Sequence, residues 1–377
     1  MKFNVPSKLL YSRASAVSKV INSKNTMTIL NKFLFSLKGD MLTITASDIE
    51  NTLSARVPVT EAEGNGSFCV DARRLVELLK ELPDQGITFD INDDNYAIEI
   101  SYLSGKYNVI GNNGAEYPAD REQPAEGEFL KFECPAKQVI QGIDRTIFAV
   151  GNDDLWPQMM GILWDIHQDD ITFVATDSRK LVKYVNRMSA PGTQGSFILP
   201  VKPASILKNI LGLSESDVTV TIEPKCVTFE TDIFSFNSRF IKGKFPDYTR
   251  VIPTSNPYEV TLDRVAFINA LRRVAIFVEE GSGLVRFRLT PSQLQLKALD
   301  NALCTSGMET LDCSFTGTEM VIGFSAAYLI EIASTISSPD IIIKLSDPSR
   351  PALFVPSEND ADSDLLMLLS PMTVQEF

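Results

Sequence analysis

The feature that most constrains the fold of this chain is a strand-and-turn pattern that occurs three times. It reads TITASDIENTLSARV at residues 43–57, TFVATDSRKLVKYVN at 172–186 and QLKALDNALCTSGM at 295–308. In each copy an alternation typical of a half-buried strand runs into an aspartate, which is Asp48, Asp177 or Asp300. These aspartates lie about a third of the chain apart. Because 377 residues exceed the usual size of one domain, the repeat predicts three similar domains.

Each third repeats the same order of elements. A short strand and an amphipathic helix begin at Phe3, Phe132 and Val260, and a strand hairpin follows. A second helix and further strands complete the third, with the second helices expected within residues 71–83, 200–212 and 325–337. The stretches EYPADREQP (116–124) and KFPDYTRVIP (244–253) are the expected linkers, because proline stiffens the chain there. The predicted domains are residues 1–125, 126–253 and 254–377.

This order of elements predicts an α+β fold in which each repeat packs two helices on antiparallel sheets. Antiparallel sheets can have one face covered and the other in water. All six helices could therefore lie on one side of a curved array of sheets.

The composition excludes several kinds of chemistry. The one histidine, His167, lies in the polar stretch DIHQDDI, so catalytic triads and histidine metal sites have no basis. The cysteines are scattered without a CxxC pair, which argues against disulfides and zinc; they are Cys69, Cys134, Cys226, Cys304 and Cys313. No phosphate-binding glycine loop occurs, so we expect no cofactor and no metal.

The chain also lacks the signals of a membrane or exported protein. No apolar run reaches the ~18 residues that a membrane span needs. The start MKFNVPSKLL has no apolar signal-peptide segment. We therefore expect a cytoplasmic protein with no membrane partner.

Charge is unevenly distributed along the chain. The net charge of −13 argues by itself against binding of phosphates. The six predicted helices, however, carry thirteen basic side chains against five acidic ones, and the rest of the chain is correspondingly acidic. Such a segregated basic surface suits contact with nucleic-acid phosphates without reading of bases.

Two other functions compete with this interpretation. One is a DNA-processing enzyme that uses Asp48, Asp177 and Asp300 as metal ligands; equivalent residues of three repeats would lie far apart, whereas two-metal catalysis needs ions ~4 Å apart. The other is a peptide-binding scaffold that does not bind DNA. The charge segregation argues against the scaffold, and salt-dependent DNA binding distinguishes it.

Several motifs together resemble one known family, the bacterial DNA polymerase III beta subunit, or sliding clamp. They are the initial MKF, NTMTILNKFLFSL in the first repeat, ATDSRKLV and KFPDYTRVIP in the second, and the final Pro371-Met372. The resemblance covers the whole chain. It implies three clamp domains in a half-ring, a head-to-tail homodimer that encircles duplex DNA, and a non-catalytic role in polymerase processivity. It also implies three kinds of protein partner: the polymerase III catalytic subunit, the clamp loader and other proteins with clamp-binding motifs.

The resemblance further implies a groove for partner peptides between the second repeat and the C-terminal tail. The matching positions are Thr176, Ser178, Arg179, Lys180, Leu181, Pro246, Arg250, Val251, Leu368, Ser370, Pro371 and Met372. The family commonly has Gly at position 178, Arg at 180 and Met at 370, and this chain ends differently, in TVQEF. These departures predict a different peptide preference.

Two further residue sets complete the expectation. Lys24, Arg73, Lys137, Lys202 and Arg272 are the candidates for contact with DNA phosphates. Tyr107 and Val109 on an edge strand are expected to meet Ile276 and Phe277 of a second copy.

Overall fold

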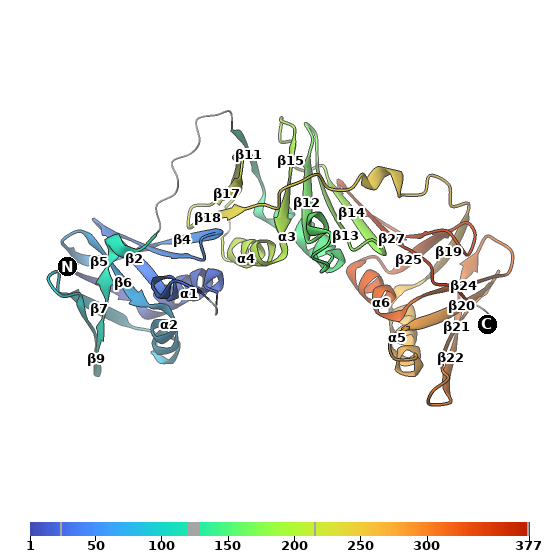
Figure 1. The fold of residues 1–377 in the computed structure, drawn as a ribbon, viewed down its shortest axis with the longest axis horizontal. Coiled ribbons are helices and arrows are strands. Elements are labelled where there is room, and N and C mark those ends of the chain that lie inside the picture. Colours follow the sequence, from blue (N-terminus) through green and yellow to red (C-terminus); the bar gives the residue numbers. More distant parts are fainter. Residues whose placement is uncertain (23–24, 119–128, 215, 375–376) are drawn as a thin grey trace. The chain divides into compact units, whose positions relative to one another are not determined.

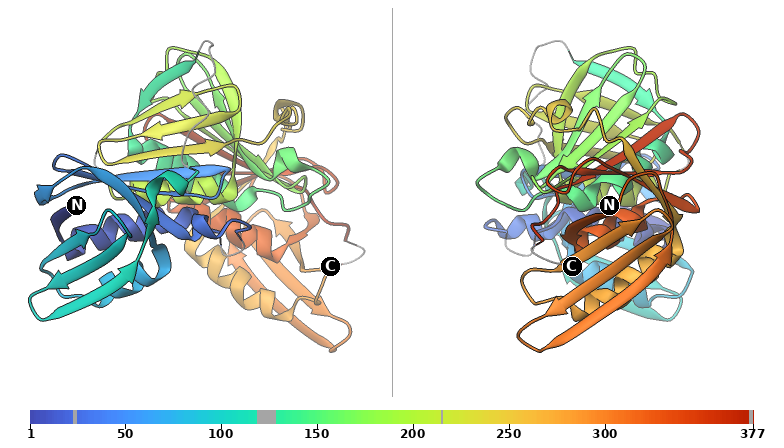
Figure 2. Two further views of the ribbon diagram at one scale, coloured as in Figure 1. Left: turned by 60° about the vertical axis from the view of Figure 1, so that its left-hand side comes forward. Right: turned by 90° about the vertical axis from the view of Figure 1, so that its right-hand side faces the viewer.

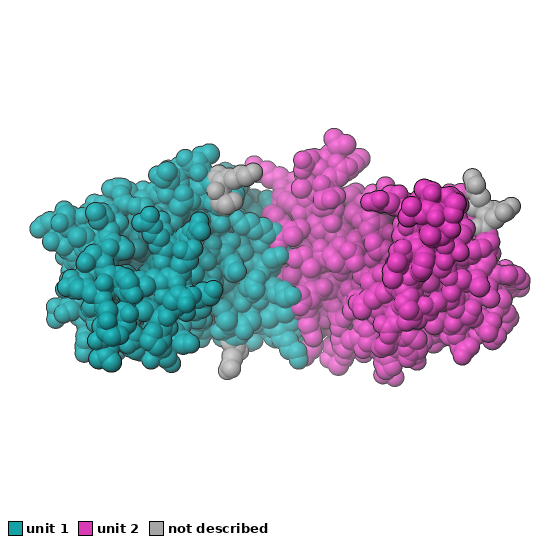
Figure 3. Space-filling view, turned by 90° about the horizontal axis from the view of Figure 1, so that it is seen from below, with its two compact units in different colours: residues 1–140, 202–240 teal, residues 141–201, 241–377 magenta. Residues whose placement is uncertain are grey.

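A computed structural model describes residues 1–22, 25–118, 129–214, 216–374 and 377. The expected domain boundary near residue 125 and the candidate Lys24 lie outside the described residues. The chain forms two compact units (Figure 3), which comprise residues 1–140 with 202–240 (unit 1) and 141–201 with 241–377 (unit 2). The middle third of the chain thus contributes strands and helices to both units.

Unit 1 contains two antiparallel sheets (Figure 1). The larger has the strand order β10 (Asn112–Asn113), β6 (Gly66–Asp71), β2 (Lys32–Lys38), β3 (Met41–Ser47), β4 (Asn51–Pro58), β18 (Phe234–Arg239), β17 (Cys226–Glu230), β16 (Val218–Ile222) and β11 (Leu130–Cys134). The smaller has the order β5 (Thr60–Glu63), β1 (Lys2–Pro6), β7 (Gly86–Ile91), β8 (Ala97–Tyr102) and β9 (Gly105–Ile110). Pairing of β4 with β18 joins strands of the first and middle thirds edge to edge.

Unit 2 repeats this plan. Its larger sheet has the order β15 (Gly195–Pro200), β12 (Gly161–Ile166), β13 (Ile171–Thr176), β14 (Lys180–Asn186), β27 (Ser363–Leu369), β26 (Ala352–Pro356), β25 (Asp340–Leu345), β19 (Tyr258–Asp263) and β23 (Ser314–Phe315). The smaller sheet has the order β22 (Thr305–Asp312), β21 (Gln293–Asp300), β20 (Leu284–Thr290) and β24 (Met320–Ser325). Here β14 and β27 join the middle and last thirds.

Six α-helices occur within the described ranges, two in each third. They are α1 (Ser7–Val17), α2 (Ala72–Glu81), α3 (Ala136–Thr146), α4 (Val201–Leu211), α5 (Arg264–Val274) and α6 (Ala326–Thr335). Short 3-10 helices are η1 (Ser18–Val20), η2 (Thr28–Asn31), η3 (Gly114–Glu116), η4 (Ile147–Ala149), η5 (Pro157–Met159), η6 (Tyr248–Arg250) and η7 (Ala275–Phe277). Asp71 and Asp263 cap α2 and α5 by accepting backbone hydrogen bonds in the first turn.

Four of the helices, α1, α2, α5 and α6, pack on sheets of their own unit. In unit 1, α1 and α2 pack against each other and against strands of the larger sheet (Figures 1 and 2). In unit 2, α5 and α6 pack together in the same way over the smaller sheet. The α+β prediction, with two helices per repeat on antiparallel sheets, is confirmed.

Alternating side chains of the strands form the core, as the sequence pattern predicted. In β2 the aromatic residues Phe33 and Phe35 are fully buried, and Phe35 lies 5.3 Å from Phe68 between ring centroids. In unit 2, Trp164 packs edge-on against Phe173 at 4.6 Å. Burial of such side chains is the main source of stability, worth roughly 1.5–3 kcal/mol each.

Candidate functional site

The three aspartates form the same turn. One carboxylate oxygen, Oδ1, accepts a hydrogen bond from a backbone N–H three residues further on in every copy. The distances are 2.8 Å from Asp48 to Asn51, 2.8 Å from Asp177 to Lys180 and 2.9 Å from Asp300 to Leu303. Aspartate is suited to this role because its short side chain reaches its own backbone. The aspartates therefore shape turns at strand ends.

The residue before the aspartate completes the turn in the first two copies. The hydroxyl of Thr176 donates to the carbonyl of Lys180 at 2.7 Å and accepts from the N–H of Ser178 at 3.1 Å. Ser47 makes the equivalent two bonds in the first repeat. The turn places Ser178 at a φ of 73°, a left-handed conformation that favours glycine.

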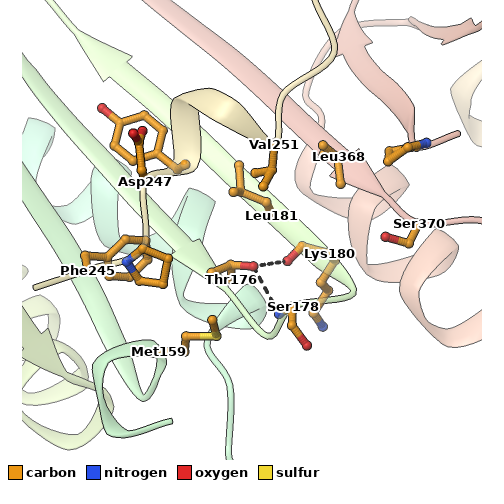
Figure 4. A pocket seen from close by; sticks show the side chains of 13 residues that line it. Met159, Thr176, Ser178, Lys180, Leu181, Phe245, Asp247, Val251, Leu368 and Ser370 are labelled. Carbon is orange, nitrogen blue, oxygen red and sulfur yellow. Dashed lines mark hydrogen bonds between the residues drawn. The ribbon is translucent and has the colours of Figure 1, made fainter.

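A groove in unit 2 lies beside the second turn (Figure 4). Its volume is about 410 Å³, and it is lined by Met159, Thr176, Ser178, Lys180, Leu181, Phe245, Pro246, Asp247, Tyr248, Val251, Pro351, Leu368 and Ser370. The floor belongs to a buried apolar cluster that includes Leu181, Phe245 and Leu368. Val251 stands at the groove with 55 % of its surface exposed. Exposed apolar surface within a concave site is typical of a binding site.

Most of the predicted groove residues line this groove, and four do not. Arg179 is exposed, and its carbonyl accepts from the N–H of Ser370 at 2.9 Å. Arg250 is 84 % exposed in its side chain and pairs with Asp247 at 2.8 Å. Met372 lies elsewhere, because its backbone pairs with Gly323 of β24. Pro371 connects these positions and is half-buried.

Sequence reasoning missed five lining residues, which are Met159, Phe245, Asp247, Tyr248 and Pro351. Three of them, Phe245, Asp247 and Tyr248, belong to the KFPDY segment, of which only Pro246 was assigned to the groove. The hydroxyl of Tyr248 donates to Asp165 at 2.8 Å, and burial together with this bond raises the pKa of Tyr248. This bond fixes the KFPDY segment against β12, and so holds one wall of the groove in place.

Lys180 is a buried cation beneath the groove. Only 5 % of its surface is exposed, and its ammonium donates to Glu331 of α6 at 2.5 Å. The ring of Tyr328, also on α6, lies 4.3 Å from the nitrogen. An ion pair combined with a cation–π contact compensates the loss of hydration. The turn of the second repeat is thereby tied to a helix of the third.

The candidate DNA-contacting lysines and arginines differ in whether they already form ion pairs within the chain. Lys137 and Arg272 are exposed, and Arg272 lines a shallow depression on α5. Arg73 pairs with Glu77 on its own helix at 2.9 Å. Lys202 pairs with Asp48 at 2.8 Å and also donates to a backbone carbonyl.

Arg145 carries one of the charges that made the predicted helices basic, yet it is used within unit 2. Its side chain is 18 % exposed and donates to the carbonyl of Thr335, to Ser337 and to Asp360. The charge available to a ligand is therefore smaller than the sequence count indicated.

The candidate residues for contact with a second copy lie on or next to edge strands, and three of the four are exposed. Tyr107 belongs to β9, an edge strand of unit 1, and is 40 % exposed. Ile276 and Phe277 follow α5, next to the edge strand β22 of unit 2, and are 77 % and 37 % exposed. Val109 lies on β9 and is half-buried.

Neither a cluster of metal ligands nor a membrane-spanning helix is found in the described parts of the chain. No three His, Cys, Asp or Glu side chains gather there as a metal ion would require. No helix there combines the length and the apolar character that crossing a bilayer needs.

Comparison with known proteins identifies the family. Models of the N-terminal, central and C-terminal domains of the DNA polymerase III beta subunit match residues 1–120, 133–247 and 249–370. A beta sliding clamp of Pseudomonas putida is 27 % identical over 97 % of this chain and 99 % of its own length. One of Caulobacter vibrioides is 26 % identical over 99 % of this chain and 100 % of its own length.

Solved structures agree. A sliding clamp of Pseudomonas aeruginosa bound to griselimycin matches with a TM-score of 0.93 and 26 % identity, covering 99 % of this chain and 100 % of that one. A clamp of Bartonella birtlesii bound to the same compound matches with a TM-score of 0.91 and 25 % identity over the same shares. Membership in this family agrees with the prediction of a non-catalytic subunit. The chain belongs to the DNA polymerase III beta subunit family, the bacterial sliding clamps.

Proposed function

We propose that two copies of this chain close head to tail into a ring that encircles duplex DNA. The observation that carries this proposal is that successive repeats are joined twice within the chain by the same edge-to-edge strand pairing. The strand after the first aspartate turn, β4, pairs with the last strand of the second repeat, β18; likewise β14 pairs with β27. Among the described residues, the same mode leaves β22 and β9 without a second neighbouring strand. Such open edges favour pairing with another chain, and two-fold symmetry closes both at once.

The intrachain pairs define the register of the contact between copies. Leu53 of β4 and Val182 of β14 occupy equivalent positions in the first and second repeats. Gly307 of β22 occupies this position in the third repeat. In the strand pairs that join the repeats, Leu53 lies opposite Phe236 and Val182 lies opposite Met367. The position in β9 that corresponds to these partners is Tyr107, so Gly307 is expected opposite Tyr107.

The absence of a side chain at Gly307 makes this register plausible. A Cβ built there would stand 2.6 Å from the ring of Phe277, so Phe277 already occupies the space above it. The Phe277 ring can then meet Tyr107 across the strand pair, with Ile276 beside it. Burying two such side chains at each of two symmetric contacts stabilises by roughly 1.5–3 kcal/mol per residue.

Sedimentation tests the ring. Ile276→Ala combined with Phe277→Ala should convert the dimer to monomers at submicromolar concentration. The matched control is Val265→Ala, which removes an exposed apolar side chain from α5 away from η7. A double variant that still sediments as a dimer at low concentration would exclude this interface.

The proposed contact with DNA is non-specific and electrostatic. The described helices carry more basic than acidic residues, and Lys137 and Arg272 are exposed on α3 and α5. Phosphate contacts of this kind weaken as salt rises. A chain that binds partner peptides but shows no salt-dependent association with DNA would instead be a peptide-binding scaffold.

The groove is proposed to tether the polymerase III catalytic subunit, the clamp loader and other partners through short peptides. An apolar side chain of the peptide would pack between Leu181, Val251 and Leu368, near the exposed cation Arg250. Such a contact is smaller than a standard interface of ~1,200 Å² or more, so binding should be weak and exchangeable. Two grooves per ring would raise its effective strength. Fluorescence polarisation with a labelled polymerase-derived peptide tests it, using Leu368→Asp as the variant expected to abolish binding.

A further inference from the structure

The chain passes from one sheet of unit 2 to the other just after the groove. β27 ends at Leu369 in the larger sheet, and the N–H of Ser370, a groove residue (Figure 4), donates to the carbonyl of Arg179 at 2.9 Å. Two residues later the N–H of Met372 donates to the carbonyl of Gly323 in β24 at 2.8 Å. In the described part of the chain β24 lies at the edge of the smaller sheet. Ser370 is therefore held between two backbone contacts that belong to different sheets.

Gly323 makes room for the tail on β24. A Cβ built at this glycine would stand 2.5 Å from Cγ2 of Val374 and 3.1 Å from the carbonyl oxygen of Met372. Real Cβ atoms essentially never make contacts under 3.0 Å, so a side chain at position 323 would push the tail away from the strand. Glycine within a strand is typical of a place where another backbone approaches closely. The tail thus fits this edge by shape as well as by its hydrogen bond.

The ring of Phe377 adds a contact on the polar face of the smaller sheet. Its centroid lies 5.3 Å from Nζ of Lys297 in β21 and 5.9 Å from Cζ of Arg288 in β20. Arg288 lies on the face opposite the buried Phe287, because side chains alternate along a strand. Arg286 shares this face, and its Nε has no hydrogen-bond partner among the described residues. An aromatic ring among these cations is favourable through cation–π attraction.

We propose that docking of Met372, Val374 and Phe377 on the smaller sheet positions Ser370 as a wall of the groove, and so raises the affinity for partner peptides. The inference rests on the proposed peptide-binding function of the groove, and adds residues outside the groove that set its affinity. Val374 and Phe377 do not line the groove and act as positioning residues. If the tail docked for only part of the time, the apparent affinity would fall by the docked fraction. By linkage, a bound peptide should stabilise the docked tail.

Fluorescence polarisation with a labelled polymerase-derived peptide tests this coupling. Phe377→Ala should weaken peptide binding by on the order of threefold to tenfold, because two cation–π contacts are lost. Lys297→Gln removes the nearer cation and should weaken binding by a smaller factor, and the double variant should resemble Phe377→Ala alone. Phe377→Trp keeps an aromatic ring and should restore the wild-type affinity. Phe377→Leu keeps an apolar side chain without a ring and should behave like Phe377→Ala.

A control variant and a second measurement separate the tail from the groove. Lys344→Gln changes another cation on a strand of unit 2, one that pairs with Glu259, and should leave the affinity unchanged. Hydrogen exchange followed by mass spectrometry reports docking without any peptide: the N–H of Met372 should be protected in the wild type and exchange faster in Phe377→Ala.

Three results would overturn different parts of the account. An unprotected N–H of Met372 in the wild type would exclude docking of the tail. Faster exchange in Phe377→Ala with unchanged peptide affinity would exclude the coupling but leave the groove as the peptide site. A wild-type chain that shows the protected tail but binds no peptide would instead refute the proposed function of the groove.

Discussion

The ion pair between Lys180 and Glu331 predicts that replacing one or the other side chain lowers the stability of unit 2 by different amounts. Glu331→Gln leaves the ammonium, 5 % exposed, with the rings of Tyr328 and Phe148 and the Asp177 carboxylate, which lies 3.9 Å away, as stabilising neighbours. Removing one partner of a buried pair costs about 3–5 kcal/mol, and the lower end applies here because Glu331 is 43 % exposed. We therefore expect a loss of about 3 kcal/mol in the free energy of unfolding of unit 2.

Lys180→Met should cost less, although it removes the same contact. The remaining Glu331 carboxylate is reached by water, and the methionine keeps the apolar stem of the side chain. Loss of a charge-assisted hydrogen bond, about 1.5–3 kcal/mol, is partly offset because no ammonium is buried. A net loss of about 1 kcal/mol is expected, and the double variant should resemble Lys180→Met alone.

Urea unfolding followed by tryptophan fluorescence measures these differences. Both tryptophans, Trp156 and Trp164, lie in unit 2, and Trp164 is fully buried, so the emission reports on this unit alone. Lys183→Met on the same strand is the matched control and should change stability by less than about 0.5 kcal/mol. A larger loss for Lys180→Met than for Glu331→Gln, or additive losses in the double variant, would refute the reasoning.

Three further predictions follow from the site. Ser178→Gly should leave unit 2 as stable or more stable by up to about 1 kcal/mol in the same urea assay, because glycine adopts a φ of 73° without strain; a clear loss would contradict this. Deletion from Ser370 to the C-terminus should abolish peptide binding in fluorescence polarisation but leave the dimer intact in sedimentation; an unchanged peptide affinity would place the partner site elsewhere. Lys137→Glu with Arg272→Glu should weaken association with DNA and flatten its salt dependence, whereas an unaltered salt slope would remove these residues from the phosphate contact.

The repeat was predictable from sequence because its signals are local. Each turn aspartate binds an N–H only three residues away, so the same short motif reports the same geometry in all three thirds. The alternation of buried residues along strands such as β2 is likewise visible in sequence. Local regularity of this kind sets the elements and their order.

The groove was only partly predictable because its walls come from distant segments. Leu181 and Leu368 follow strand alternation and the family motifs. Met159 and Pro351 lie in connections far from either motif, and nothing in their local pattern indicates the groove. Long-range contacts also determine which basic side chains are available to a ligand. From sequence Arg145 looks like a free cation on a helix, but it donates to the carbonyl of Thr335, 190 residues away. Such contacts are defined by tertiary packing, which overrides local pattern.

Retention on DNA of defined topology tests the proposed ring most directly. The protein is loaded by a clamp loader onto a nicked circular plasmid, and half of the sample is then cut once with a restriction enzyme. Gel filtration at a salt concentration that suppresses phosphate contacts separates bound from free protein. A closed ring that slides should remain on the circle and leave the linear DNA through its ends. Equal retention on both forms would contradict encirclement and would reduce the association to ordinary electrostatic binding.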